Sequence, residues 1–318
     1  MTELNEIHVP VLLERCLELL EPALSHEGAV LIDATLGMGG HTEAALNRFP
    51  GLRVIGIDRD EDAIAIASER LGALAERVQF VHAVYDEIDA VCEELGITAV
   101  DGVLFDLGVS SLQLDRAERG FAYSQDAPLD MRMDRSGPIT AAHILAEYSE
   151  AELRSVFYRY GDEKLAPRYA RAIVAERERA AIERSGRLVE ILSAATPAAL
   201  RHSGHPAKRV FQALRIEVNQ ELAALERAIP AALNRLRVGG RIVVLSYQSL
   251  EDRLVKRAFA AAASSSAPAG LPQELPEHRA QFRLLVRGAE RASQNEQDRN
   301  SRATPVRLRA AERLRAAA

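Results

Sequence analysis

A glycine-rich segment and an aspartate downstream of it have the residue types and spacing of a nucleotide-binding site. The segment Asp33-Ala-Thr-Leu-Gly-Met-Gly-Gly-His41 follows an apolar run and precedes a helical pattern. Glycines let a backbone approach a ligand closely, and a helix N-terminus offers unpaired N–H groups and a positive dipole end. Asp58 ends the next apolar run, nineteen residues after Gly39. A carboxylate at that point can accept hydrogen bonds from both ribose hydroxyls, so the pattern predicts recognition of a nucleotide-type ligand.

The same segment departs from two common phosphate-binding loops. It is not a Walker A loop, because no Gly-Lys-Ser/Thr follows. A dinucleotide fingerprint has a third glycine where Thr42 stands, which disfavours NAD. An acid before the glycines, a glycine-rich turn and an acid ending the second strand instead resemble class I S-adenosylmethionine-dependent methyltransferases. The alternative is a glycine-rich loop that serves only as a turn.

The elements that would position these residues alternate in the first third of the chain. Four short apolar runs, rich in β-branched or aromatic residues, lie at 30–33, 54–58, 78–81 and 102–106. Helical patterns separate them at 41–49, 61–74 and 87–95. This alternation predicts βαβ units and a parallel sheet, the Rossmann-like α/β class. A fifth strand, at 241–246, comes only after about 135 further residues.

The interval before that strand predicts a helical insertion. Helical patterns at 141–160, 163–180 and 187–195 replace the strand signal there. We expect a first part of the catalytic domain at 1–113, a helical insertion for substrate recognition at 114–210 and a second part at 211–318. A low-complexity loop is expected at about 260–276. The helical pattern over 207–237 contains Pro230, which should kink or split it.

Composition and charge restrict the class of protein. The net charge is −6, yet residues 164–209 and 279–318 each carry +6, which leaves −18 for the rest. Two basic segments on an acidic body are compatible with a polyanionic partner. No apolar run is long enough to span a membrane, and the first residues show no leader pattern. Only Cys16 and Cys92 are present, both at apolar helical positions, so a disulfide and a zinc site are disfavoured and a reducing cytoplasm is expected.

Several longer motifs resemble one known family. They are His8-Val-Pro-Val-Leu-Leu13, Phe105-Asp-Leu-Gly-Val-Ser-Ser111, Glu118-Arg-Gly-Phe121 with Pro128-Leu-Asp-Met-Arg-Met-Asp134, the run from His205 to Leu222, and Ser246-Tyr-Gln-Ser-Leu-Glu-Asp-Arg253. In this order they resemble the bacterial RsmH (MraW) family over nearly the whole chain. The resemblance implies an S-adenosylmethionine-dependent methyltransferase that modifies N4 of a decoding-centre cytosine in 16S ribosomal RNA. It favours the assembled small subunit over naked RNA as substrate.

The resemblance also implies roles for particular residues. Gly39, Gly40 and His41 would line the methionine end of the cofactor. Asp58 would hold the ribose, and Tyr85 would face the adenine. Asp106 and Gln113 would complete the pocket. Each has a structural alternative: Tyr85 as core filler, His41 as a first-turn helix residue and Gln113 as a loop surface residue.

A proton acceptor near the exocyclic amine would help this reaction. The lone pair of N4 is delocalised into the cytosine ring, so an acceptor for an N4 proton would favour transfer. Asp106 is the nearest candidate, and the Ser110 hydroxyl or loop carbonyls could share the task. An equal alternative makes Asp106 only a cofactor ligand. Methylation at C5 needs a positioned thiolate, and neither Cys16 nor Cys92 lies in a substrate loop.

The base must leave its stack to reach the methyl group, which directs attention to residues that could face RNA. Phe121, Tyr123 and Phe211 are candidate stacking partners or core residues, and Arg132 either contacts a phosphate or pairs with Asp130 or Asp134. The insertion's expected basic face consists of Lys164, Arg168, Arg171, Lys208 and Arg209. The pair His202 and His205 is read as RNA-facing or structural.

Alternatives to this reading remain open. A nicotinamide-dependent oxidoreductase would use the same sheet architecture. A noncatalytic RNA-binding factor with a vestigial pocket would keep the basic segments without the reaction. The sequence leaves both a monomer and an isologous homodimer open.

Overall fold

The computed structural model describes residues 10–200, 204–265, 267, 275 and 278–316, and the chain forms two compact units. The first unit comprises Met1–Gly108 and Ala223–Ala318, and the second comprises Val109–Leu222. The second unit extends twelve residues further than the expected insertion 114–210 at its C-terminal side. The reason is that α10 (Ala207–Asn219) packs against α7 (Glu150–Gly161) of the same unit. Within the described residues, no helix is long and apolar enough to cross a membrane.

A seven-stranded sheet organises the first unit, in the order β3-β2-β1-β4-β5-β7-β6. Strands β1 to β5 are parallel, and β7 runs antiparallel to both of its neighbours. The strands are β1 Val30–Asp33, β2 Arg53–Asp58, β3 Val78–His82, β4 Val100–Asp106, β5 Leu236–Ser246, β6 Phe282–Leu284 and β7 Arg307–Arg313. The predicted Rossmann-like α/β class is confirmed.

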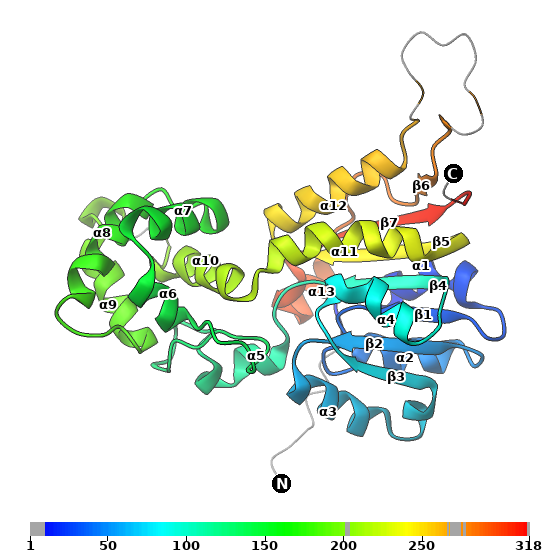
Figure 1. The fold of residues 1–318 in the computed structure, drawn as a ribbon, viewed down its shortest axis with the longest axis horizontal. Helices are drawn as coiled ribbons and strands as arrows, with labels where there is room; N and C mark the ends of the chain where they lie inside the picture. The colour runs from blue at the N-terminus through cyan, green and yellow to red at the C-terminus, as the bar shows by residue number, and fades with distance from the viewer. Residues whose placement is uncertain (1–9, 201–203, 266, 268–274, 276–277, 317–318) are drawn as a thin grey trace. The chain divides into compact units, whose positions relative to one another are not determined.

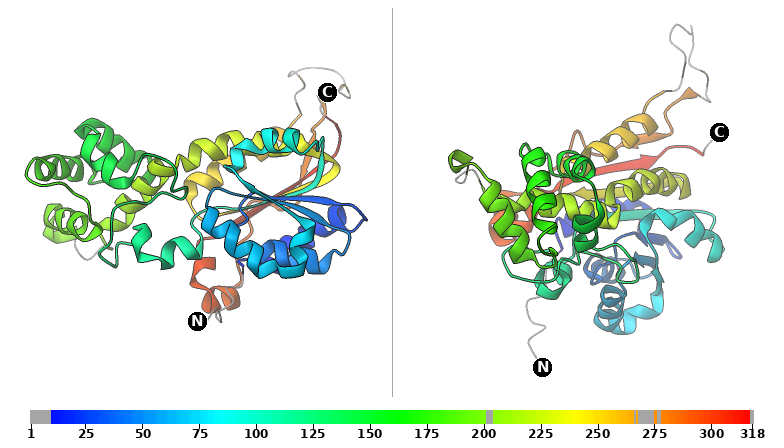
Figure 2. Two further views of the ribbon diagram at one scale, coloured as in Figure 1. Left: turned by 60° about the horizontal axis from the view of Figure 1, so that its bottom comes forward. Right: turned by 60° about the vertical axis from the view of Figure 1, so that its left-hand side comes forward.

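Helices cover both faces of this sheet, as Figures 1 and 2 show. The helices of the first unit are α1 Leu13–Leu24, α2 Gly40–Arg48, α3 Glu61–Leu71, α4 Ile88–Glu94, α11 Glu221–Arg235, α12 Ser249–Ala262 and α13 Gln294–Arg299. Neighbouring residues of β1 belong to two hydrophobic cores, one on each face of the sheet. Leu31 packs in the core formed with α1 and α2, and Ile32 packs in the core formed with α4, α11 and α12. This alternation is what a strand covered on both faces requires.

The second unit is helical and has its own core. Its helices are α5 Ser111–Asp115, α6 Ala141–Glu147, α7 Glu150–Gly161, α8 Ala166–Arg177, α9 Ser185–Ala195 and α10 Ala207–Asn219. Short 3₁₀ turns occur in both units. They lie at Gly72–Arg77, Tyr85–Glu87 and Ser301–Ala303 in the first unit and at Ala117–Arg119 and Ala198–Leu200 in the second.

Three expected elements differ from the structure. The pattern at 141–160 forms two helices, because the Ser149 side chain caps α7 by accepting from the Glu152 N–H. The pattern at 207–237 breaks at Gln220, which has a left-handed φ of 50°, and Pro230 lies inside α11. Of the expected loop at about 260–276, residues up to Ala262 belong to α12, and 266, 268–274 and 276 lie outside the described residues.

We expect Gly161→Ala to destabilise the protein. A Cβ at this position would lie 2.5 Å from the carbonyl oxygen of Arg209, so α7 and α10 would have to separate. Overpacking of this kind costs about 1–3 kcal/mol, which outweighs the better helix propensity of alanine. Urea denaturation measures the effect. Gly137→Ala is the matched control, since its Cβ would meet only Asp134, at 3.6 Å; equal losses for both variants would contradict the explanation.

Candidate functional site

The glycine-rich loop connects β1 to α2 and is shaped by its neighbours. Gly39 caps α2 with a left-handed φ of 77°, a conformation that favours glycine. A Cβ on Gly40 would lie 2.6 Å from Cγ of Pro10. The close approach therefore involves the protein's own N-terminal segment, which lies against the first turn of α2.

Asp33 ends β1 and is almost completely buried. Its Oδ2 accepts a 2.7 Å hydrogen bond from the Thr42 hydroxyl, and its Oδ1 accepts from the Thr35 N–H at 3.3 Å. Burial raises the pKa of Asp33, and these hydrogen bonds act in the opposite direction. Thr42, the residue in place of a third glycine, thus has a structural use in holding this carboxylate.

Asp58 ends β2 and ties the glycine loop to the sheet. Its Oδ2 accepts from the Gly37 N–H at 2.7 Å, and its Oδ1 accepts from the Asp60 N–H at 2.9 Å. Burial raises the pKa of Asp58. A carboxylate has about four acceptor positions, so these two bonds leave capacity for further donors such as hydroxyls.

Asp106 ends β4, and several of the other site residues converge on it. Its backbone N–H donates to Oγ1 of Thr35 at 2.6 Å. Its Oδ1 accepts a 2.7 Å hydrogen bond from the Tyr247 hydroxyl, and its Oδ2 lies 3.7 Å from Nδ1 of His41. About a quarter of the side chain, 26%, is exposed. The carboxylate is therefore held by the protein on one side and accessible on another.

Tyr247 is the site residue that the sequence reasoning did not single out. It follows β5, and β5 pairs with β4 so that Leu245 lies opposite Asp106. Burial raises the pKa of the Tyr247 hydroxyl well above its usual value, and the Asp106 carboxylate adds to the shift. Its position could have indicated it, because Tyr247 lies in the motif 246–253, directly after a strand that was predicted to belong to the same parallel sheet.

His41 is buried in the first turn of α2. Its Nε2 lies 3.3 Å from the carbonyl oxygen of Val11. Burial lowers the pKa of His41, and the Asp33 carboxylate opposes that shift. The segment that supplies the carbonyl is itself fixed, because the N–H of Leu12, at a left-handed φ of 52°, donates to Oε1 of Glu296 in α13 at 2.7 Å.

Two of the predicted cofactor residues have local partners of their own. Tyr85 begins a 3₁₀ turn after β3 and packs edge-to-face on Phe105, with 5.7 Å between ring centroids. Gln113 belongs to the helical unit, where it is buried and forms a capping box with Ser110 at the start of α5. The structure thus joins Asp33, His41 and Asp106 in one cluster, whereas the cofactor roles of Tyr85 and Gln113 stay predictions.

The aromatic residues predicted to face RNA are mostly core. Phe121 and Phe211 are buried in the core of the helical unit, so their structural alternative holds. Tyr123 stacks on His205 with 4.5 Å between ring centroids and meets the edge of Phe211. His202 lies outside the described residues.

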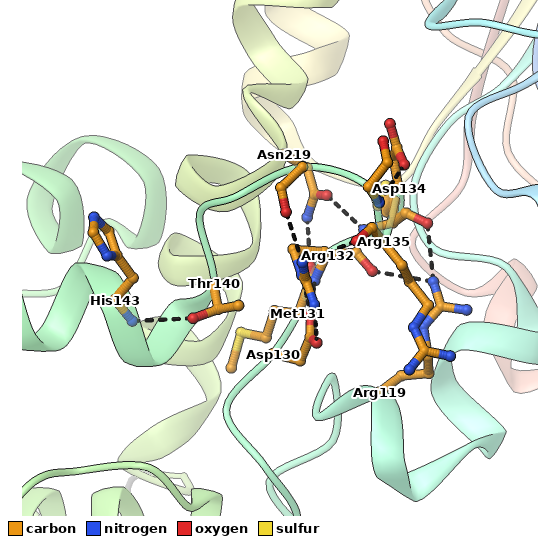
Figure 3. A network of polar contacts seen from close by, with 12 residues as sticks. Arg119, Asp130, Met131, Arg132, Asp134, Arg135, Thr140, His143 and Asn219 are labelled. Atoms are coloured by element: carbon orange, nitrogen blue, oxygen red, sulfur yellow. Dashed lines mark hydrogen bonds and ion pairs between the residues drawn. The ribbon is translucent and has the colours of Figure 1, made fainter.

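A polar network, shown in Figure 3, fixes the segment 128–134, which is part of the third motif named above. Asn219 donates from Nδ2 to the Met131 carbonyl at 2.7 Å, and its Oδ1 accepts from the Met133 N–H at 2.7 Å. Met131 has a left-handed φ of 61°. Arg119 donates to the carbonyls of Arg132 and Met133 at 3.0 and 2.9 Å. The side chains of Asn219 and Arg119 therefore stabilise an otherwise unfavourable backbone conformation.

Arg132 pairs with Asp130, which was the structural alternative to a phosphate contact. Its Nε and Nη2 donate to the two carboxylate oxygens of Asp130 at 2.8 Å, and its Nη1 donates to the carbonyls of Arg135 and Gly137. These bonds hold the pKa of Asp130 below its ordinary value although burial acts to raise it. The guanidinium is engaged within its own loop, and the phosphate contact considered for it is not supported.

The two basic segments differ in how their charges are used. The predicted basic face of the helical unit is exposed at all five residues, Lys164, Arg168, Arg171, Lys208 and Arg209. In the C-terminal segment, Arg307 and Arg309 pair with Asp252, and Arg283 pairs with Glu312. Arg313 is buried and donates to the carbonyls of Leu233, Asn234 and Leu236. The C-terminal excess of arginine is therefore partly structural.

We expect Asn219→Ala to lower the free energy of unfolding by at least about 2 kcal/mol. The substitution leaves a buried N–H and a buried carbonyl without their partner, at about 1–3 kcal/mol each. Asn47→Ala, an exposed change on α2, is the matched control and should cost no more than about 0.5 kcal/mol. Urea denaturation of both variants measures the difference, and equal losses would contradict the role given to the Asn219 side chain.

Comparison with known proteins identifies the family. The model of the MraW methylase family matches residues 5–314. The chain is 67% identical over 312 residues to ribosomal RNA small subunit methyltransferase H of Clavibacter michiganensis, with 98% of each chain covered. The proteins of that name from Leifsonia xyli and Saccharopolyspora erythraea are 65% and 61% identical over 98% of this chain and 96% and 94% of theirs. The chain belongs to the MraW methylase family.

Proposed function

We propose that this protein is a cytoplasmic S-adenosylmethionine-dependent methyltransferase that methylates N4 of a decoding-centre cytidine in 16S rRNA, acting on the assembled small subunit. The observation that carries the proposal is the convergence of Asp33, Asp58 and Asp106 at the carboxyl ends of three adjacent parallel strands, beside a glycine loop. Open α/β sheets bind their ligands at this edge. The name shared by relatives at 61–67% identity supports the choice of small-subunit rRNA as substrate.

The donor set fits the cofactor's chemistry. S-adenosylmethionine carries a cationic amine and a sulfonium, which suit a cluster of carboxylates, and ribose hydroxyls, which suit the remaining acceptor positions of Asp58. Gly39, Gly40 and His41 would hold the methionine end and Tyr85 the adenine, while Asp106 and Gln113 would complete the pocket. When bound, the cofactor supplies a methyl group already activated for transfer.

The protein's own contribution is alignment and proton acceptance. Asp106 has one oxygen engaged by Tyr247 and the other directed towards His41, with part of the side chain exposed. A carboxylate in this position accepts a proton from the N4 amine, which localises the nitrogen lone pair for attack. The protein must also hold the cytosine base in the correct orientation against the Asp106 carboxylate, and such orientation can supply a large part of the rate enhancement.

RNA docking falls to the helical unit in this proposal. Lys164, Arg168 and Lys208 are exposed, and no ion pair involves them in the part of the chain that the structure describes. Arg209 donates to the Asp162 carbonyl at 2.9 Å, which brings the start of α10 next to the end of α7. Unpaired cations gathered in this way can neutralise backbone phosphates.

Cofactor binding is tested by thermal unfolding with added ligands. S-adenosylhomocysteine at 100 times its Kd should stabilise the protein by about 2.7 kcal/mol, and NAD should not. Asp58→Ala should lose most of this stabilisation, whereas Glu69→Gln, an exposed change on α3, should keep it. Stabilisation by NAD alone would replace the proposal with an oxidoreductase.

The reaction is tested with small subunits isolated from cells that lack the protein. Incubation with labelled S-adenosylmethionine and nucleoside mass analysis should reveal N4-methylcytidine. Asp106→Asn should reduce kcat by about 10²–10⁴-fold, the range of general base catalysis. Retained binding of S-adenosylhomocysteine by this variant identifies a catalytic role, and lost binding identifies a cofactor ligand. Cofactor binding without any label in the subunits would refute the substrate assignment.

A further inference from the structure

Residues 10–12, which we call the strap, lie against the glycine loop. A Cβ on Gly40 would lie 2.6 Å from Cγ of Pro10, so only a glycine lets the strap come this close. The carbonyl oxygen of Val11 lies 3.3 Å from Nε2 of His41. The strap therefore contacts two consecutive residues in the first turn of α2, and both belong to the set that would hold the methionine end of the cofactor.

The backbone of the strap is fixed by a residue near the other end of the chain. Leu12 has a left-handed φ of 52°, which a leucine rarely adopts. Its N–H donates to Oε1 of Glu296 in α13 at 2.7 Å, and its carbonyl accepts from the Cys16 N–H at 2.9 Å. An unfavourable backbone conformation persists only where its surroundings determine it in this way.

Burial decides where the strap lies, but it does not decide how its backbone turns. Val11 and Leu12 are buried in a core that also contains Ala292 and Ala303 of the C-terminal segment. Hydrophobic burial has no direction, so these side chains could stay in the core with more than one backbone conformation. The hydrogen bond to Glu296 is directional, and it favours the conformation in which the Val11 carbonyl faces His41.

We propose that Glu296 is a positioning residue for the cofactor, because through the strap it keeps Gly40 and His41 in their binding conformation. The proposal rests on the roles given to these two residues in the function proposed above. A site that is only partly populated in its binding conformation has an affinity reduced by that fraction. Once the cofactor is bound, its own contacts hold the loop. Glu296 therefore acts on cofactor affinity and leaves the rate of methyl transfer unchanged.

The first test needs no cofactor. Amide hydrogen exchange followed by NMR should show that the Leu12 N–H is protected in the unaltered protein. In Glu296→Ala this N–H loses its acceptor and should exchange at least about tenfold faster. Glu296→Gln keeps a side-chain carbonyl that can accept the same bond, so it should keep most of the protection. Equal protection in all three proteins would overturn the role given to this bond.

The second test measures the Kd of S-adenosylhomocysteine by isothermal titration calorimetry. Glu296→Ala should bind about tenfold more weakly, and Glu296→Gln should bind nearly as well as the unaltered protein. Glu296→Asp keeps the charge but is one methylene shorter, so it should weaken binding as alanine does. The aspartate variant also replaces the alanine variant if the latter does not fold. At saturating S-adenosylmethionine, kcat should stay within about twofold in every variant.

Glu290→Ala is the matched control. Glu290 also ties the two ends of the chain together, since it accepts from Nε of Arg15 at 2.9 Å, but its partner belongs to α1 and not to the strap. The control should therefore keep the Kd of the unaltered protein. Equal losses of affinity in Glu290→Ala and Glu296→Ala would make the effect one of general stability and overturn the proposal.

The same titrations separate this proposal from the function on which it rests. If the unaltered protein does not bind S-adenosylhomocysteine, the proposed function fails and the role of Glu296 fails with it. If the unaltered protein binds, and Glu296→Ala and Glu296→Asp bind equally well, only the role of Glu296 is refuted.

Discussion

Carboxylates at the ends of neighbouring strands repel one another and, where they are buried, lose their hydration, so the first unit must surround them with hydrogen-bond donors. Asp33, Asp58 and Asp106 end β1, β2 and β4, which are adjacent in the sheet. Burial raises the pKa of the first two, so each needs donors to stay charged. Backbone N–H groups of the glycine loop and the hydroxyls of Thr42 and Tyr247 supply those donors. The loop conformation, the first turn of α2 and the segment after β5 all follow from this requirement.

The helical unit meets a different constraint with similar means. Its long loop between α5 and α6 has little regular structure. Hydrogen bonds from side chains take the place of the backbone–backbone hydrogen bonds of a helix or strand. Asn219 at the end of α10 and Arg119 at the start of the loop bind its carbonyls, and Arg132 binds the carboxylate two residues before it. A loop held by this many bonds keeps one conformation.

The sequence was informative where local pattern and tertiary structure agree. The strands β1 to β4 appear as apolar runs because both faces of the sheet are covered, and the ends of those runs place Asp58 and Asp106 correctly. Local pattern failed where a single residue decides the chain direction. The sequence predicted a kink or break at Pro230, but the helix ends at Gln220, which has a left-handed conformation. It also failed for side chains whose partners are distant in sequence. The pairing of Tyr247 with Asp106 spans 141 residues, and nothing local distinguishes an arginine paired with Asp252 from one facing solvent.

The bond between Leu12 and Glu296 has a consequence for how the protein is made. These residues lie 284 positions apart in the chain. Synthesis from the N-terminus therefore delivers the glycine loop long before the residue that fixes its neighbouring segment. Until Glu296 has been added, the segment whose Val11 carbonyl lies against the His41 ring lacks this hydrogen bond, so the support of the glycine loop forms late in synthesis.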